Sequence, residues 1–219
     1  DGKKAMLAYF IMGRSENSRN RIFSRTEDGI RTEAFDPAKL SDPSLIIYAP
    51  VRRLENRLIV SNGDQTDTIY EGFRRGLSLS EALSTRAFEP DAPNYTPRIS
   101  GVLRFEDGNF SYELSILKSD RMNPDQCIRF YFNYATPLPG EGHFIHTYIG
   151  DGNPLQSFCG EPKCIAVDDE LDAFAAKIWD ALDPENKISL YVRETDLTDG
   201  TGKNYREVLI NRNEKKQEA

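Results

Sequence analysis

The sequence predicts an α+β fold in which large antiparallel sheets are covered by a few helices. Short apolar runs, separated by turn-forming residues, recur along the 219 residues and indicate ten or eleven strands. Only three segments show the apolar spacing of amphipathic helices. Because each helix must bury its apolar side on a sheet face, these elements predict a layered sandwich in one domain, residues 1–219.

Three pairs of strand-like runs surround turn sequences and predict β-hairpins. The pairs are residues 20–25 with 29–35 around "TEDG", 44–52 with 57–63 around "RLEN", and 98–105 with 110–117 around "EDGN". The other strand-like runs are residues 5–13, 127–134, 143–150, 163–167, 187–194 and 205–211.

The three helical segments differ in the signals that mark them. In residues 64–77, Ile69, Phe73 and Leu77 recur every four positions. Residues 78–88 open with a serine followed three positions later by a glutamate, which predicts a capping box. Residues 168–182 carry acids in the first turn and a regular apolar stripe. The intervening residues 89–95 are rich in proline and acids and indicate a loop.

Composition narrows the function classes. A formal net charge of −7 argues against a broad nucleic-acid surface, and no apolar run approaches the ~20 residues of a membrane span. The three cysteines, an odd number, do not form a disulfide framework, so we expect a reducing cytoplasm. We interpret residues 1–4 as a possible cloning remnant and residues 211–219 as a frayed, charged tail.

A polar cluster follows the apolar run at residues 57–60. Its members are Asn62, Asp64, Gln65, Thr66 and Asp67. One interpretation is a capped strand-to-helix turn, with Asp64 or Ser61 as the cap. The other is a ligand site, because side chains and free N–H groups converge at the start of a helix. The two aspartates oppose a phosphate there and favour a neutral or cationic group such as an amide.

Several arginines stand at the ends of apolar strands. They are Arg25, Arg52, Arg53 and Arg98. Two or three of them meeting in one pocket would bind a phosphate, because a guanidinium group pairs with phosphate through two hydrogen bonds. Each of them taken singly is more typical of a solvated strand end.

Tyr48 and Glu113 are polar groups inside predicted strands. Alternation along residues 110–117 places Glu113 opposite the apolar face, toward solvent or a cleft. No Gly-x-Ser-x-Gly motif is present, and no cysteine has an evident activating neighbour, so the sequence does not indicate a nucleophilic triad.

The segment from Gly140 to Cys164 contains both histidines and two cysteines. His143, His146, Cys159 and Cys164 could supply a tetrahedral zinc site. However, strand positions three apart point to opposite faces, so packing or polar catalytic roles are the favoured interpretation and we expect no metal.

Five motifs in order give the chain a family resemblance. They are "FIMGRSENSRNRIFSRTEDG", "PSLIIYAPVRR", "VSNGDQTDTIYEG", "NYTPRISGV" and "GEGHFIHTYIGDGNPLQSFCGEP". Together they resemble the archaeal-type inosine monophosphate (IMP) cyclohydrolase family, here as a bacterial member. The resemblance extends from about residue 6 to about residue 210.

The resemblance implies a fold, a reaction and a set of site residues. The fold would be a four-layer αββα sandwich like that of N-terminal-nucleophile hydrolases, without the N-terminal nucleophile. The enzyme would close 5-formamidoimidazole-4-carboxamide ribonucleotide to IMP with loss of water, without cofactor, in a homo-oligomer such as a tetramer. The site residues carried over by motif are Arg25, Tyr48, Asn62, Asp64, Gln65, Thr66, Asp67 and Arg98, with Glu113 from the matching strand.

The chemistry suits these residues. In our hypothesis Arg25 and Arg98 bind the 5′-phosphate or formyl oxygen, Tyr48 donates a proton, and Glu113 or Asp67 acts as base. Asn62, Gln65 and Thr66 would hold the carboxamide and ring, with Arg52 as a further substrate-binding candidate. Two alternatives stay open: an amide hydrolase on the same fold, and a purine-nucleotide-binding protein without turnover.

Overall fold

The computed structural model describes residues 2–40, 43 and 46–213 and confirms an α+β fold of mostly antiparallel sheets and few helices. The described residues form twelve strands rather than ten or eleven: β1 Lys4–Met12, β2 Arg21–Arg25, β3 Gly29–Ala34, β4 Val51–Leu54, β5 Arg57–Ser61, β6 Arg98–Glu106, β7 Asn109–Asp120, β8 Asn123–Tyr134, β9 Glu141–Phe144, β10 Lys163–Ala166, β11 Lys187–Asp196 and β12 Tyr205–Asn211. The helices are α1 Glu16–Arg19, α2 Gln65–Arg74, α3 Leu79–Ala82 and α4 Leu171–Ala181, with 3-10 turns at Pro37–Lys39 and Leu83–Thr85.

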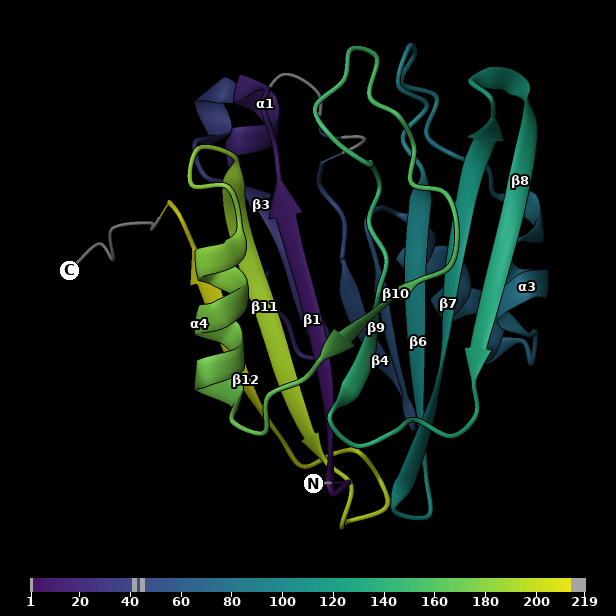
Figure 1. Cartoon of the computed structure of the whole chain (residues 1–219), viewed down its shortest axis with the longest axis vertical. Coiled ribbons are helices and arrows are strands. Elements are labelled where there is room, and N and C mark those ends of the chain that lie inside the picture. Colours follow the sequence, from purple (N-terminus) through teal and green to yellow (C-terminus); the bar gives the residue numbers. More distant parts are fainter. Residues whose placement is uncertain (1, 41–42, 44–45, 214–219) are drawn as a thin grey trace.

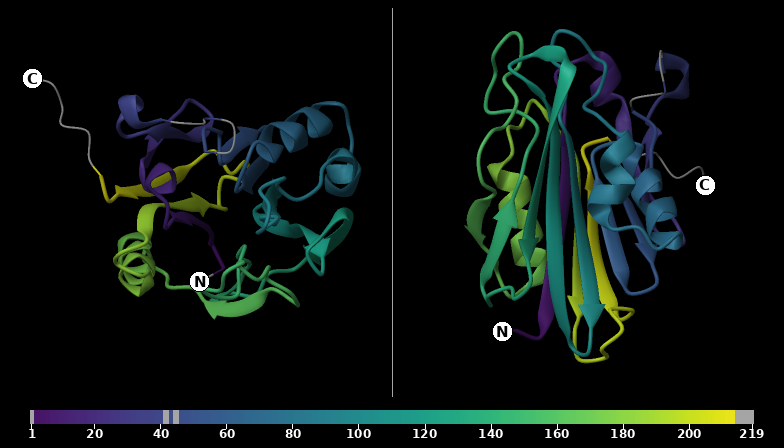
Figure 2. Two further views of the ribbon diagram at one scale, coloured as in Figure 1. Left: turned by 90° about the horizontal axis from the view of Figure 1, so that it is seen from above. Right: turned by 90° about the vertical axis from the view of Figure 1, so that its right-hand side faces the viewer.

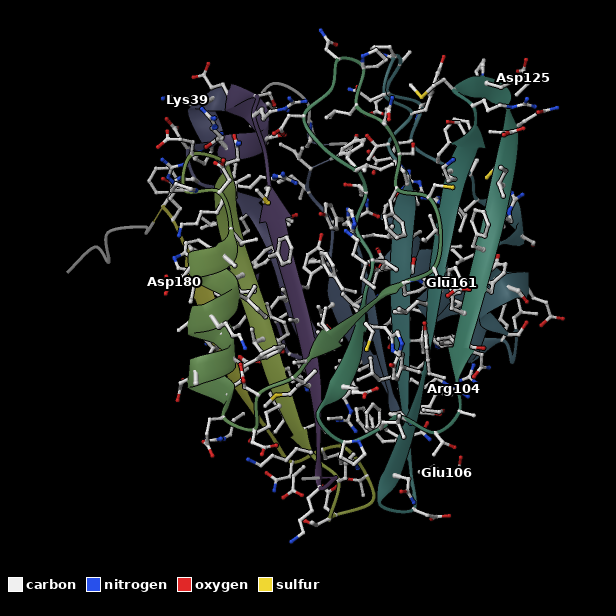
Figure 3. The ribbon with its side chains drawn as sticks, viewed as in Figure 1. Lys39, Arg104, Glu106, Asp125, Glu161 and Asp180 are labelled. Atoms are coloured by element: carbon white, nitrogen blue, oxygen red, sulfur yellow. The ribbon has the colours of Figure 1, made fainter. Side chains whose placement is uncertain are left out.

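The large sheet is a seven-stranded meander in the order β2-β3-β4-β5-β6-β7-β8 (Figure 1). The three predicted hairpins are confirmed as β2–β3, β4–β5 and β6–β7. Figure 3 shows Glu106, at the end of β6, and Asp125, near the start of β8, at opposite ends of the molecule. The starts of β6 and β8 therefore share one end, and Arg98 lies there.

The second sheet brings the first strand of the chain beside the last two. It has three strands in the order β1-β11-β12, with β1 antiparallel to β11. A separate two-stranded sheet, β9 with β10, lies in front of β1 and β6 in Figure 1.

Alternation along β1 explains how the two sheets stack. Ala5, Leu7, Tyr9 and Ile11 are buried and pack against apolar residues of the seven-stranded sheet, including Phe23. Successive side chains of a strand point to opposite faces, so the other residues of β1 face away from this core.

Helices cover the outer faces of the sheets (Figure 2). Ile69 and Phe73 of α2 pack on the seven-stranded sheet, and Phe174 of α4 packs on Leu190 and Val192 of β11. The predicted capping box at Ser78 is present at the start of α3. The longest described helix has 11 residues, and none in the described part of the chain could span a bilayer.

Two predicted strands are shorter than expected. Tyr48 lies in a bend rather than inside a strand, because β4 begins only at Val51; residues 44 and 45 of that run lie outside the described residues. The Thr32 hydroxyl accepts a hydrogen bond from the Tyr48 backbone N–H at 2.9 Å, which replaces a ladder bond. In the run 143–150, the strand ends at Phe144.

The predicted frayed tail is ordered at its start. Asn211 closes β12, and its side chain bonds the backbone of Phe23 in both directions, at 2.8 and 3.0 Å. Residues 214–219 of that prediction lie outside the described residues.

Candidate functional site

The candidate site begins at the turn between β5 and α2. The Ser61 and Thr66 hydroxyls lie 2.5 Å apart and are buried, and both also bond the carbonyl of Gly63. The hydroxyl of Thr66, expected to bind substrate, is therefore used to hold the turn. Asp64 occupies the N-cap position as expected, but its carboxylate makes no cap hydrogen bond.

Two amide side chains tie this turn to the start of β6. The Asn62 side-chain oxygen accepts hydrogen bonds from the Ile99 backbone and from Gln65, both at 2.9 Å, and its nitrogen donates to the Pro97 carbonyl at 2.9 Å. Gln65 is fully buried. The predicted polar cluster is thus a rigid platform rather than a set of free side chains.

Arg98 is the centre of the site's charge network. One of its nitrogens donates to Asp64 and to Gln65, each at 2.7 Å. Asp64 also accepts a hydrogen bond from Arg86. Burial of Asp64 opposes its ionisation, but the Arg86 hydrogen bond and the charge of Arg98 outweigh burial and lower its pKa. Asp64 is therefore a fixed anion that anchors two arginines instead of capping the helix.

Glu89 supplies a carboxyl group that titrates near neutrality. It lies in the predicted loop, is only 7% exposed, and stands 4.0 Å from Arg98. Burial raises the pKa of Glu89 to about 7; the charge of Arg98 opposes this rise, and the charge of Asp91 adds to it. A carboxyl group with such a pKa can accept and return protons at neutral pH.

Two buried phenols lie within electrostatic range of this carboxyl. The Tyr48 and Tyr9 hydroxyls share a hydrogen bond of 2.9 Å. Burial raises the pKa of Tyr48, while the charge of Arg21 and the hydrogen bond with Tyr9 oppose the rise. The charge of Glu89 raises the pKa of both phenols, so all three groups lie within electrostatic range of one another.

The segment after β9 covers the loop that carries Glu89. The hydroxyl of Tyr148 shares a hydrogen bond with Thr96, whose hydroxyl also bonds Asp91. Burial raises the pKa of Tyr148 to about 12; the Thr96 hydrogen bond opposes this rise, and the charges of Asp91 and Glu89 reinforce it. The motifs "NYTPRISGV" and "GEGHFIHTYIG" therefore meet in space.

A cavity of about 420 Å³ lies between β1 and the β6–β7 part of the other sheet. Its wall includes Ala8, Val60 and Gly101, and the first two directly precede Tyr9 and Ser61 in their strands. The cavity has the size of a small-molecule site. Tyr9, Tyr48, Glu89 and Arg98 are not among its wall residues, so it is a hollow distinct from the polar cluster.

Arg25, Arg52 and Asp67 are not brought to this cluster. Arg25 pairs with Glu207 at 2.5 Å, at the opposite end of β2 from Arg21. Arg52 and Asp67 pair with each other at 2.8 Å, and the guanidinium of Arg52 lies over Tyr70 of α2, on the helix-covered face.

Glu113 also lies on the helix-covered face. It pairs with Arg104 at 3.1 Å, and Arg104 lies 5.9 Å from the ring of Phe73 in α2. Tyr112 and Leu114, its neighbours in β7, line the cavity instead. Alternation along β7 therefore directs Glu113 away from Tyr48.

The histidines and cysteines do not gather into a metal site. His143 stacks on Tyr134 with ring centres 3.9 Å apart and bonds Tyr112 at 2.5 Å, whereas His146 bonds the Tyr148 carbonyl. Across the described ranges, no group of three or more His, Cys, Asp or Glu side chains could hold a metal ion.

Sequence reasoning missed Glu89, Arg21 and Tyr9. Arg21 stands four residues before the predicted Arg25, and its side chain is buried at the start of β2. The signal available for Glu89 was an acid in the loop just before the "NYTPRISGV" motif. Tyr9 carried no signal, because an aromatic residue in an apolar strand is ordinary core.

Comparison with known proteins agrees with the motif resemblance. A family model described as IMP cyclohydrolase-like protein matches residues 1–200. The chain is also similar to an IMP cyclohydrolase from Methanopyrus kandleri, with 28% identity over 116 residues, which cover 52% of this chain and 52% of the relative. The chain thus spans about half the length of the curated relative that it matches.

Proposed function

Because this chain belongs to the IMP cyclohydrolase-like family, we propose that it closes 5-formamidoimidazole-4-carboxamide ribonucleotide to IMP with loss of water. The observation that carries this proposal is the buried Glu89 carboxyl, whose pKa is about 7, in electrostatic range of Tyr48 and 4.0 Å from Arg98. Ring closure needs a proton acceptor and a proton donor on either side of one small molecule, and this cluster supplies both.

In the proposed mechanism the carboxamide nitrogen attacks the formyl carbon, and Glu89 accepts the proton that this nitrogen loses. Tyr48 donates a hydrogen bond to the formyl oxygen, which gains protons and leaves as water while the formamide nitrogen loses its hydrogen. In this mechanism the Tyr9 hydroxyl donates the hydrogen bond that it shares with the Tyr48 hydroxyl. Tyr48 can therefore donate its own hydrogen to the substrate. Holding the two ends of the substrate together can lower the barrier by up to ~7–11 kcal/mol.

The remaining residues would bind and orient. Arg98 and Arg21 would attract the negative charge that develops on the formyl oxygen or bind the substrate phosphate. Asn62 and Gln65 would hold this platform in place through their bonds to β6. The pairing of Glu113 with Arg104 and of Asp67 with Arg52 favours Glu89 over both as the base.

The packing supports two finer proposals on architecture. The described residues would form one domain with four layers, αββα, as in N-terminal-nucleophile hydrolases, because α4 covers the three-stranded sheet and α2 covers the seven-stranded sheet. The homo-oligomer that the resemblance implies is a proposal that sedimentation would test.

The direct test is to mix the purified protein with the formylated ribonucleotide and to follow the ultraviolet absorbance change that accompanies IMP formation. A saturable rate that falls in Glu89→Gln supports the proposal. Tight nucleotide binding without any turnover would instead identify a binding protein, and release of a free acid would identify an amide hydrolase.

A further inference from the structure

Three cationic side chains surround a small hollow separate from the Glu89 cluster, where α1 meets the start of β11 and the end of β12. The hollow has a volume of about 190 Å³, and its wall is formed by Arg19, Lys187, Ile188, Arg212 and Asn213. Neither Tyr48 nor Arg98 contributes to it. The hollow is thus a site of concentrated positive charge in a chain whose net charge is −7.

None of the three cations is paired with a carboxylate within the described part of the chain. Each is instead held by a backbone carbonyl: Arg19 by that of Gly13 at 3.2 Å, Lys187 by that of Trp179 at 3.0 Å, and Arg212 by that of Glu185 at 2.7 Å. The nearby carboxylate of Asp183 accepts the backbone N–H groups of Glu185 and Asn186.

This arrangement fixes the cations in position, and no carboxylate among the described residues pairs with them. A lysine ammonium has three N–H donors and a guanidinium has five, so the carbonyl contacts leave most of them unused. Like charges that line one hollow repel each other, and an anion in the hollow would turn this repulsion into attraction.

We propose that this hollow binds a phosphate group, as inorganic phosphate or as the phosphate of a small monoester. Phosphate offers oxygens in several directions, and two guanidinium groups and an ammonium group from three chain segments match that geometry. The bound anion would clamp the segment from Gly13 to Arg19 onto β11 and β12. Existing contacts already join these parts, since Arg19 donates to Asn186 at 3.1 Å and Asn213 donates to the Arg19 carbonyl at 3.2 Å.

The sole tryptophan of the chain provides a local readout. The Lys187 ammonium lies 4.6 Å from the centre of the Trp179 ring, so an anion that pairs with Lys187 changes the environment of the indole. The experiment titrates the full chain with inorganic phosphate, and separately with ribose 5-phosphate, against chloride at equal ionic strength. Tryptophan emission and binding heat are recorded together.

The matched variants are Arg212→Gln and Arg75→Gln. Arg75 is an exposed arginine of the α2 end whose side chain also donates to a backbone carbonyl, that of Glu71 at 3.2 Å. We expect a saturable emission change with phosphate that weakens about ten- to hundredfold in Arg212→Gln and is unchanged in Arg75→Gln. If monoester binds and inorganic phosphate does not, the hollow recognises the ester.

Two results would overturn the proposal. One is equal phosphate affinity in Arg212→Gln and in the wild type. The other is the absence of both a saturable emission change and any binding heat that depends on Arg212. Binding at the Glu89 cluster does not interfere, because heat from that site persists in Arg212→Gln.

Discussion

Replacing Glu89 with glutamine keeps the size of the side chain and removes the one carboxyl group of the cluster whose pKa lies near neutrality. Because the neighbouring Asp64 remains ionised between Arg98 and Arg86, the charge network around the site is retained. The substitution therefore tests proton transfer with little change in packing.

The size of the effect on stability follows from the pKa. Burial raises the pKa of Glu89 from 4.5 to about 7, and at about 1.4 kcal/mol per pKa unit this rise corresponds to roughly 3 kcal/mol. The folded state holds the proton more tightly, so this stabilisation is complete below pH 4.5 and is lost as the pH rises through 7. Glutamine does not ionise, so Glu89→Gln does not lose this stability as the pH rises. We therefore expect the variant to become more stable relative to the wild type between pH 5 and pH 8.

Activity should change in the opposite direction. A general base typically contributes a rate factor of about 10²–10⁴, so kcat of Glu89→Gln should fall by at least 100-fold and lose its dependence on a group titrating near pH 7. The assays are urea unfolding at pH 5 and pH 8 and the absorbance assay for IMP from pH 5 to pH 9. Glu113→Gln removes a carboxyl on the helix-covered face and should keep its turnover.

A wild-type rate and pH profile in Glu89→Gln would exclude Glu89 as the base. An identical change in stability of the wild type and the variant between pH 5 and pH 8 would show that Glu89 titrates as an ordinary surface carboxyl.

Three further predictions concern other parts of the chain. Tyr48→Phe should lower kcat by roughly 10²-fold or more while nucleotide affinity measured by calorimetry is retained; unchanged turnover would remove the phenol from the mechanism. Arg25→Gln should keep kcat within about twofold, because Arg25 lies in an exposed ion pair with Glu207 away from the Glu89 cluster; a large loss would return Arg25 to the site. In Gly202→Ala the new Cβ would lie 2.5 Å from the Phe105 ring, whereas in Gly76→Ala, which shares the positive φ, it would meet no atom within 4 Å. Gly202→Ala should therefore lower the free energy of unfolding in urea by about 1–3 kcal/mol more than Gly76→Ala does. Equal losses of unfolding free energy would show that contact with Phe105 does not matter.

Local patterns predicted the elements well where contacts between sequence neighbours decide the structure. The hairpins around "TEDG", "RLEN" and "EDGN" form because turn chemistry and alternation act within a few residues. The capping box at Ser78 is equally local. Tyr48 is a position where local pattern is not sufficient. Its backbone N–H donates to the side-chain hydroxyl of Thr32 in another strand instead of to a backbone carbonyl, and the strand does not include it.

The candidate site could be predicted only in part. Asn62, Asp64, Gln65 and Arg98 do converge, although mostly as a platform that bonds to itself. The sequence could not choose between Arg21 and Arg25, because both stand in one motif and only the position along β2 separates them.

The sequence by itself determined the α+β class, the order of hairpins and helices, and the motifs that identify the family, since each of these depends on short-range periodicity or on residue identity. Only the tertiary structure decided that Glu89, marked in the sequence only as an acid in the loop before the "NYTPRISGV" motif, would be buried 4.0 Å from Arg98 and within electrostatic range of two phenols. Its pKa depends on desolvation by segments distant in the chain, and desolvation is a property of the packed molecule that no stretch of sequence carries alone.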